Sequence, residues 1–128
     1  MKNFILITIL FFSSFVCSSQ TKENRVFLGK KFAEKELEFA LSKQNQNNVL
    51  DDDESLLKDS NTAIKIGEST LFNIYGKVNI LDEKPYEIYL IKNYWVIQGT
   101  LPKKSKGGTF LIILNAKNAE VIKISHGK

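Results

Sequence analysis

Residues 86–101 read YEIYLIKNYWVIQGTL, and this stretch decides the fold class. Apolar side chains recur with a period of two on both sides of the pair Lys92-Asn93. Such alternation is typical of β-strands, and a two-residue loop containing asparagine, which tolerates positive φ, is typical of a tight hairpin. The sequence therefore predicts strands over 86–91 and 94–101 that are joined by a turn at Lys92 and Asn93.

The alternation continues toward the C-terminus. It predicts a third strand over 109–115, a turn over 116–119 and a fourth strand over 120–125. Residues 101–108 form a longer loop that contains Pro102 and the pair Gly107-Gly108. Both faces of the third strand are apolar, so the sheet needs cover on two sides. We expect helices on one face and, on the other, a partner, the curvature of the sheet itself or the segment that leads into the domain.

Upstream of the strands the apolar period changes to that of helices. Residues 30–42 form the first predicted helix, whose apolar face is Ala33, Leu37, Ala40 and Leu41. Residues 62–75 form the second, with Ser60 or Asn61 as the cap and Gly76 as the stop. Its expected apolar stripe comprises Ala63, Ile66, Gly67, Thr70 and Ile74, with Leu71 and Phe72 beside it.

Between these helices lies the acidic run 51–54. It lacks the glycine of a calcium loop, so we interpret it as the start of a short helix over 55–57. No helix is expected after Gly76. The predicted class is α+β: N-terminal helices packed on a curved antiparallel sheet of about four strands.

The first nineteen residues have the pattern of an export signal. Lys2 precedes an apolar run that ends at Val16, and this run is too short to span a bilayer. Cys17 and Ser19 provide the small side chains that cleavage requires, so the predicted mature chain begins at Gln20. We expect 1–19 to be a signal peptide, 20–128 to be a single domain, and the mature protein to be periplasmic. The alternative is a lipoprotein anchored to the membrane at Cys17, although Val16 stands where such a site needs a small residue.

Composition narrows the possible functions. Cys17 is the only cysteine, so cleavage after Ser19 leaves neither a disulfide nor a thiolate metal site. The formal net charge is +4, and residues 58–128 hold eleven lysines against six acidic residues. This mild excess does not predict nucleic-acid binding. It is compatible with a basic face toward an envelope surface or an acidic protein partner.

The search for catalytic groups selects none. His126 is the one histidine, and Ser125 beside it should point to the opposite face of a strand. Gly107-Gly108 lacks the spacing and the following helix of a phosphate loop. We therefore predict no enzyme activity, no metal and no cofactor.

The aromatic side chains of the hairpin are candidates for core packing, and they are also the types that anchor protein interfaces. The candidate partner-binding residues are Tyr86, Tyr89, Tyr94, Trp95, Gln98, Lys103 and Lys104.

Five stretches, taken in order, resemble a known family. They are 74–80 (IYGKVNI), 84–86 (KPY), 93–102 (NYWVIQGTLP), 107–115 (GGTFLIILN) and 124–128 (ISHGK). Residues 63–128, about half of the chain, are similar to the nuclear transport factor 2-like fold immunity proteins of bacteria. The resemblance implies a cone-shaped fold and a non-catalytic role in binding and blocking a toxin. It gives structural roles to Gly99, Gly107, Pro102 and Trp95.

Three hypotheses of function follow. The first is an exported immunity protein whose partner is a cognate toxin acting in the cell envelope, such as a cell-wall hydrolase, a lipase or a pore former. The second is a periplasmic small-molecule-binding module or enzyme, with a pocket between sheet and helices formed by Tyr89, Trp95, Gln98 and His126 or their neighbours. A third hypothesis, an envelope structural protein, would be favoured by a lipidated Cys17.

Overall fold

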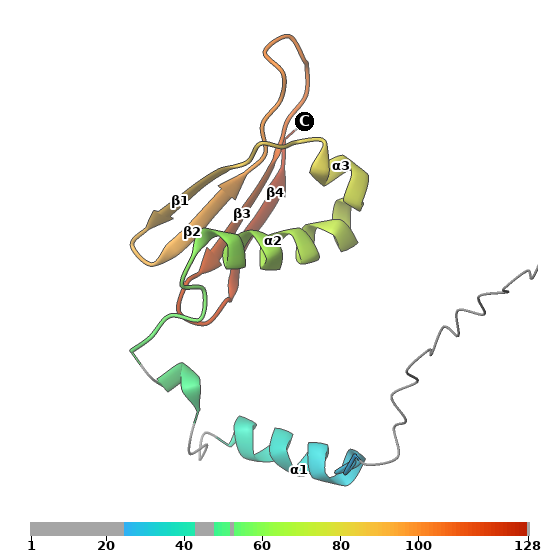
Figure 1. Cartoon of the computed structure of the whole chain (residues 1–128), viewed down its shortest axis with the longest axis vertical. Helices are drawn as coiled ribbons and strands as arrows, with labels where there is room; N and C mark the ends of the chain where they lie inside the picture. Colours follow the sequence, from blue (N-terminus) through green and yellow to red (C-terminus); the bar gives the residue numbers. More distant parts are fainter. Residues whose placement is uncertain (1–24, 43–47, 52, 128) are drawn as a thin grey trace, which may run out of the picture. The chain divides into compact units, whose positions relative to one another are not determined.

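A computed structural model describes residues 25–42, 48–51 and 53–127 of the chain (Figure 1). The chain divides into two units, Met1–Asn45 and Gln46–Lys128. The described part of the first unit contains one helix, α1 (Lys30–Leu41), which confirms the helix predicted over 30–42. The predicted signal peptide lies outside the described residues.

The helices of the second unit lie before the sheet in the sequence. They are the single turn η2 (Val49–Asp51), α2 (Ser60–Tyr75) and α3 (Lys77–Leu81). The cap of α2 is Asp59, and not Ser60 or Asn61, because Asp59 Oδ1 accepts the N–H of Thr62 at 2.9 Å. Gly76, at φ 87°, ends α2 as predicted.

Two expectations for this region were wrong. Helix α3 follows Gly76, where no further helix was predicted. Residues 55–57 do not form a helix. Instead the N–H groups of Leu56 and Leu57 donate to the carbonyl oxygens of Lys117 and Ala116, at 3.1 and 2.9 Å. Leu57 is thereby buried beside the sheet.

The sheet is an antiparallel meander of four strands in sequence order. They are β1 (Glu87–Ile91), β2 (Tyr94–Gln98), β3 (Phe110–Asn115) and β4 (Val121–His126). The four predicted strands are therefore confirmed, with ends that differ by up to three residues. Lys92 and Asn93, at φ 48° and 64°, form the predicted turn between β1 and β2. A bulge between β3 and β4 shifts their register at Ile113 and Leu114.

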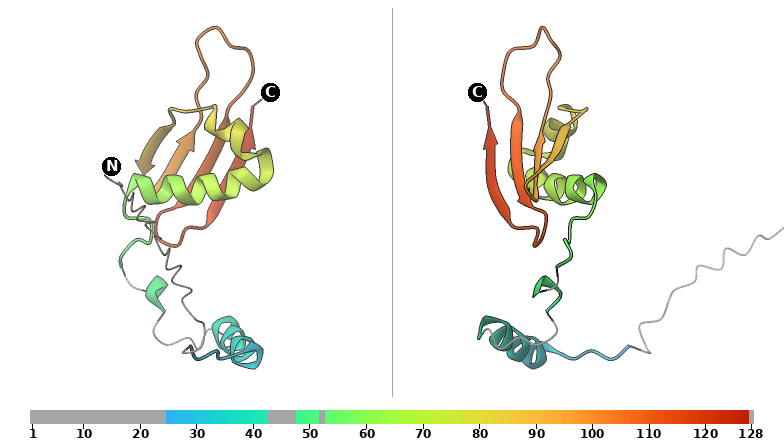
Figure 2. Two further views of the ribbon diagram at one scale, coloured as in Figure 1. Left: turned by 45° about the vertical axis from the view of Figure 1, so that its right-hand side comes forward. Right: turned by 90° about the vertical axis from the view of Figure 1, so that its left-hand side faces the viewer.

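The core of the second unit lies between the sheet and the helices. Figure 2 shows α2 and α3 on one face of the sheet, which establishes the α+β class. The small residues Ala63 and Gly67 and the side chain of Leu71 form the buried stripe of α2. They pack on Trp95 and Ile97 of β2 and on Phe110, Ile112 and Leu114 of β3. The stripe is thus rotated from the predicted one, and Ile66 and Ile74 are exposed.

No helix within the described ranges is long and apolar enough to cross a membrane.

Candidate functional site

The sheet has a second face, which we call the outer face. Because strand side chains alternate, the residues between the core positions point away from α2. The pairing places Tyr89 opposite Val96 and Val96 opposite Ile113, so these three lie in a row across β1, β2 and β3. Among residues 53–127, no helix lies on this side of the sheet (Figure 2).

At one end of this row the outer face is hollowed. The hollow, of about 310 Å³, is lined by Ile91, Lys92, Tyr94, Val96, Ile113 and Ile122. Large apolar side chains are exposed here: 53% of the surface of Ile91 and 49% of that of Ile122 are accessible. Exposed apolar patches with a polar border mark interaction surfaces in soluble proteins. The outer face is therefore the strongest candidate for a binding surface.

The candidate partner-binding residues fall into four places. Tyr89, Tyr94 and Gln98 lie on the outer face. Trp95 is buried against the core, and its Nε1–H donates to the carbonyl oxygen of Leu57 at 2.9 Å. Tyr86 is half-buried beside Phe110, and its hydroxyl lies 3.1 Å from both Glu68 Oε1 and the carbonyl oxygen of Ile80.

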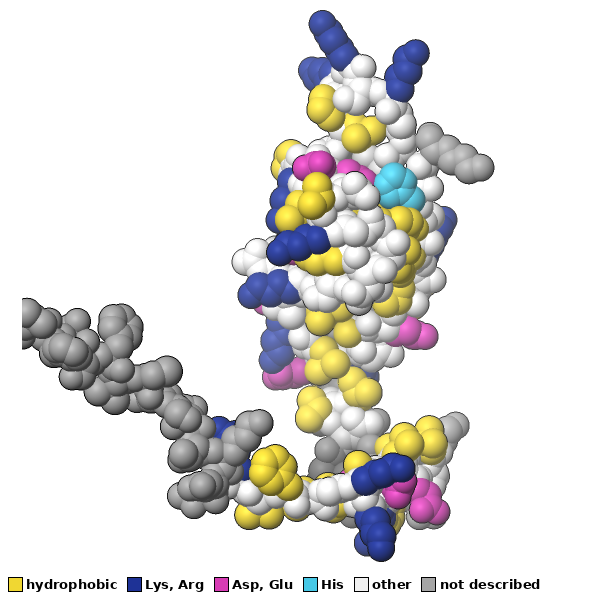
Figure 3. Space-filling model, turned by 90° about the vertical axis from the view of Figure 1, so that its right-hand side faces the viewer, with side chains coloured by type: hydrophobic (Ala, Val, Ile, Leu, Met, Phe, Trp, Pro, Cys, Tyr) yellow, Lys and Arg dark blue, Asp and Glu magenta, His cyan; other side chains and the backbone are white. Residues whose placement is uncertain are grey.

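Lys103 and Lys104 are exposed on the long loop between β2 and β3. Figure 3 shows lysine side chains projecting from the tip of this loop, beyond the body of the second unit. The structure thus does not bring the seven candidates together at one site. For all seven residues, partner binding stays a prediction.

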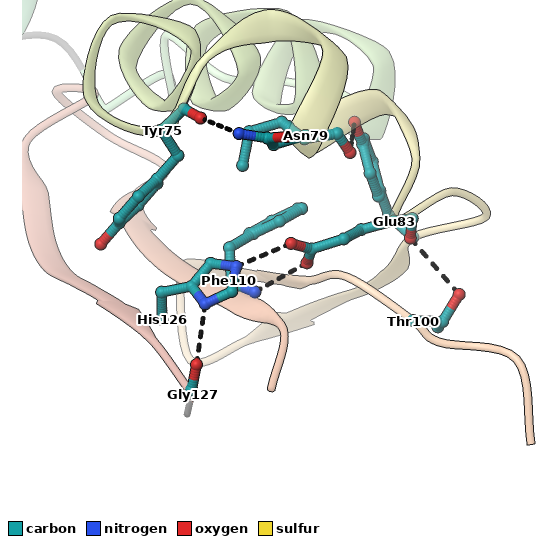
Figure 4. A network of polar contacts seen from close by, with 9 residues as sticks. Tyr75, Asn79, Glu83, Thr100, Phe110, His126 and Gly127 are labelled. Atoms are coloured by element: carbon teal, nitrogen blue, oxygen red, sulfur yellow. Dashed lines mark hydrogen bonds and ion pairs between the residues drawn. The ribbon is translucent and has the colours of Figure 1, made fainter. Parts of the chain in front are cut away.

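A second cluster, which the sequence did not indicate, surrounds Glu83. This residue follows α3 and is only 6% exposed. Its carboxylate accepts the backbone N–H of Phe110 at 2.8 Å and lies 2.8 Å from His126 Nε2 (Figure 4). His126 Nδ1 lies 2.8 Å from the carbonyl oxygen of Gly127. The sequence around Glu83 gives no signal of these contacts, because Phe110 and His126 lie far along the chain.

The hydrogen bond with Gly127 and the one with Glu83 raise the pKa of His126 above its usual value. The histidine is therefore stabilised as a cation, held between two acceptors. The pair is fully hydrogen-bonded, since both ring nitrogens of His126 and both oxygens of Glu83 have partners. Its clear role is to fix the end of β4 to the segment that follows α3.

Beside this pair the surface has an open hollow of about 460 Å³. It is lined by Tyr75, Asn79, Asp82, Glu83, Leu101 and His126. The pocket predicted between sheet and helices was to be formed by Tyr89, Trp95, Gln98 and His126 or their neighbours, and of these four residues His126 lines the hollow. The structure separates them, with Tyr89 and Gln98 on the outer face and Trp95 in the core. Within the described ranges, no three potential metal ligands lie together.

Comparison with known proteins points to a family. Residues 62–128 match the NTF2 fold immunity protein family. The uncharacterized protein YhhH of Escherichia coli (strain K12) is 32% identical over 75 residues, which are 58% of this chain and 59% of YhhH. The uncharacterized protein YbbC of the same strain is 31% identical over 123 residues, which are 92% of this chain and 91% of YbbC. No solved structure matches the chain significantly.

The chain thus spans less than two thirds of YhhH but nearly the whole of YbbC. The family match covers more than half of the chain. It includes the four strands, α3 and all of α2 except its first two residues. The helices on one face of a four-stranded meander agree with the fold named in the family's description. The chain belongs to the NTF2 fold immunity protein family.

Proposed function

We propose that the protein binds and neutralises a cognate antibacterial toxin without catalysing a reaction. The family match over residues 62–128 carries the proposal. The outer face supports it, because it offers exposed aromatic and aliphatic side chains to a partner. Tyrosines at the centre of an interface supply much of the binding energy, while charges at its border set specificity and association rate.

The mode of neutralisation is occlusion. A four-stranded sheet backed by helices is a rigid surface, so little conformational entropy is lost when it binds. Covering the toxin's active site, or the surface that recognises its target, would stop the toxin while leaving it intact. Neither of the two proteins of E. coli bears on the kind of toxin, since both are described only as uncharacterized.

The proposed place of action is the cell envelope. Support comes from residues 1–19, where a single lysine, an apolar run and small residues follow the order of an export signal. An exported inhibitor protects against a toxin that acts outside the cytoplasm, such as a cell-wall hydrolase, a lipase or a pore former. Retention of Cys17 with attached acyl chains would instead make the protein membrane-anchored.

Co-expression tests the function. The product of the adjacent reading frame is directed to the periplasm of a test strain, with or without this protein, and survival is counted. We expect survival only with the full chain. A version without residues 2–19 tests location, and we expect it to protect poorly. Equal killing with and without the full chain would contradict the proposed function.

A mass spectrum of the protein purified from the envelope fraction tests the processing. We expect a chain that begins at Gln20. A mass that includes Cys17 with acyl chains would show instead that the protein is a lipoprotein.

A further inference from the structure

The outer face is one continuous apolar surface and not a set of scattered side chains. Tyr89, Val96 and Ile113 lie side by side in register, and Ile91, Tyr94 and Ile122 surround the hollow at the end of this row. The accessible fractions of Tyr89 and Tyr94 are 48% and 39%. Tyrosine combines a large apolar ring with a hydroxyl. This suits it to a surface that is exposed to solvent in the free protein and buried in a complex.

The core of the second unit does not use this surface. Its buried side chains, such as Phe110 and Ile112, point to the opposite face, where α2 and α3 lie. Substitutions on the outer face therefore remove few contacts from the folded second unit. A surface that contributes little to folding yet carries seven large apolar side chains, Leu111 among them, is best explained by binding.

The charges that border the outer face are unbalanced. Lys92 lines the hollow, and Lys123 lies on the same face of β4, opposite Ile113. In the described part of the chain, neither lysine has a carboxylate within ion-pair distance. Of the residues that the strands place on this face, Glu87 alone is acidic. Its carboxylate already accepts hydrogen bonds from the Tyr89 hydroxyl and from Gln98 Nε2.

This charge distribution indicates which kind of protein binds the outer face. A second copy of the chain would bring the same lysines to the interface and no free carboxylate to pair with them. Burying a charge without a partner is costly, so self-association through this face is disfavoured. A different protein that carries apolar side chains next to carboxylates satisfies both the apolar centre and the two lysines.

We infer that the outer face is the surface that docks the toxin, and that the toxin presents to it an apolar patch bordered by Asp or Glu side chains. The inference rests on the proposed function, because it assigns a surface and a chemistry to that same binding. It places Tyr89, Ile91, Tyr94 and Ile122 at the centre of the interface and Lys92 and Lys123 at its border.

A matched pair of isoleucines tests the apolar centre. Ile91 on the outer face and Ile74 on α2 are both 53% exposed, so truncating either to alanine removes the same exposed group. Binding to the purified product of the adjacent reading frame is measured by calorimetry. We expect Ile91→Ala to raise the Kd about tenfold and Ile74→Ala to change it less than about twofold. Tyr94→Ala should have a larger effect than Ile91→Ala.

A matched pair of lysines tests the charge. Lys123→Glu reverses a charge on the outer face, and Lys77→Glu reverses one on α3, on the other side of the sheet. We expect Lys123→Glu to weaken binding by more than about tenfold, mainly through slower association at low salt. Lys77→Glu should leave the Kd within about twofold, and salt should weaken wild-type binding more than that of Lys123→Glu.

Each result decides between the alternatives. Failure of the wild-type chain to bind or protect ends the proposed function, and the inference falls with it. Protection by the wild-type chain together with equal affinities for the two isoleucine variants overturns the inference alone. A wild-type dimer in sedimentation that Ile91→Ala converts to a monomer would assign the face to a second copy. A loss of thermal stability in free Ile91→Ala as large as that of a core truncation would show that the chain covers the face itself.

Discussion

Glu83 shows how one side chain joins three parts of the second unit. Its carboxylate holds the N–H of Phe110 at the start of β3 and His126 at the end of β4. Its backbone oxygen accepts the N–H of Thr100 at 2.8 Å. A buried carboxylate is tolerated only when such partners satisfy it. The partners of its side chain are 27 and 43 residues away, so no local pattern could have predicted this role.

The His126 contacts predict a dependence of stability on pH. Only the imidazolium donates from both ring nitrogens, to Gly127 and to Glu83. Two hydrogen bonds raise the pKa of His126 above 6.5. The one with Gly127 has the larger effect, and the one with Glu83 has the smaller. This contribution is therefore complete below the unfolded pKa and is lost as pH rises through the folded pKa. Urea unfolding between about pH 5 and pH 9 should show the loss.

The control for this prediction is His126→Gln, which keeps a hydrogen-bonding side chain but does not titrate. Its free energy of unfolding should lack the decline that the wild-type protein shows as pH rises through the folded pKa of His126. Parallel curves for the two proteins would show that the histidine does not couple protonation to folding.

Gly99 is required by the position of Glu83. A Cβ atom at Gly99 would lie 2.1 Å from Glu83 Oε2 and 2.8 Å from its Cβ, which is not physically possible without movement. We expect Gly99→Ala to displace the carboxylate and to lower the free energy of unfolding by about 1–3 kcal/mol, the cost of unsatisfied buried polar groups. Chemical denaturation provides the measurement. The same substitution should cost less in a Glu83→Gly background, which removes the whole clashing side chain, and an equal cost there would contradict the proposed clash.

At the scale of elements, the sequence predicted the strands, turns and helix ends that neighbouring residues determine. Alternation and the Lys92-Asn93 turn gave the four strands, and Gly76 gave the end of α2. Helix α3 and the Leu57 segment were not predicted. α3 has only five residues, too few for a periodic signal. Leu57 is held by the turn between β3 and β4 and by Trp95, contacts that span the domain.

The rotation of the α2 stripe leads to a prediction about Gly67. This residue faces the sheet, where an added Cβ would lie 3.4 Å from Ile97 Cδ1 and 3.5 Å from Ile112 Cγ2. That is close but tolerable contact, and glycine is unfavourable within a helix. We expect Gly67→Ala to leave stability unchanged or to raise it by up to about 1 kcal/mol. Thermal unfolding of the variant tests this expectation.

A larger residue provides the contrast. Gly67→Leu would press on the side chains of Ile97 and Ile112 and should lower the free energy of unfolding by about 1–3 kcal/mol. A stable Gly67→Leu variant would show that the contact between α2 and the sheet is looser than the structure indicates.

At the scale of the whole molecule, the sequence predicted a sheet with two apolar faces but could not say what covers the second. That question depends on three-dimensional packing, which alternation does not encode. In the described part of the second unit, α2 and α3 cover the face of Phe110 and Ile112, and no helix covers the other. The sequence did name Tyr89, Tyr94 and Gln98 as candidates. It named Trp95 and Tyr86 with them, and only the structure shows that these two pack on the core side, because aromatic residues serve both core and interface.

Neutralisation by occlusion predicts a stoichiometry. An inhibitor that works by binding neutralises only the toxin molecules that it occupies. Titrated into toxin held well above the Kd, the wild-type protein should lower activity in a straight line to an end point fixed by the number of binding sites. Ile91→Ala, as a weaker binder, should give a curved titration that reaches the same floor at higher concentration. If a small fraction of one equivalent of this protein inactivated all of the toxin, and did so progressively with incubation time, the protein would instead be an enzyme that modifies the toxin.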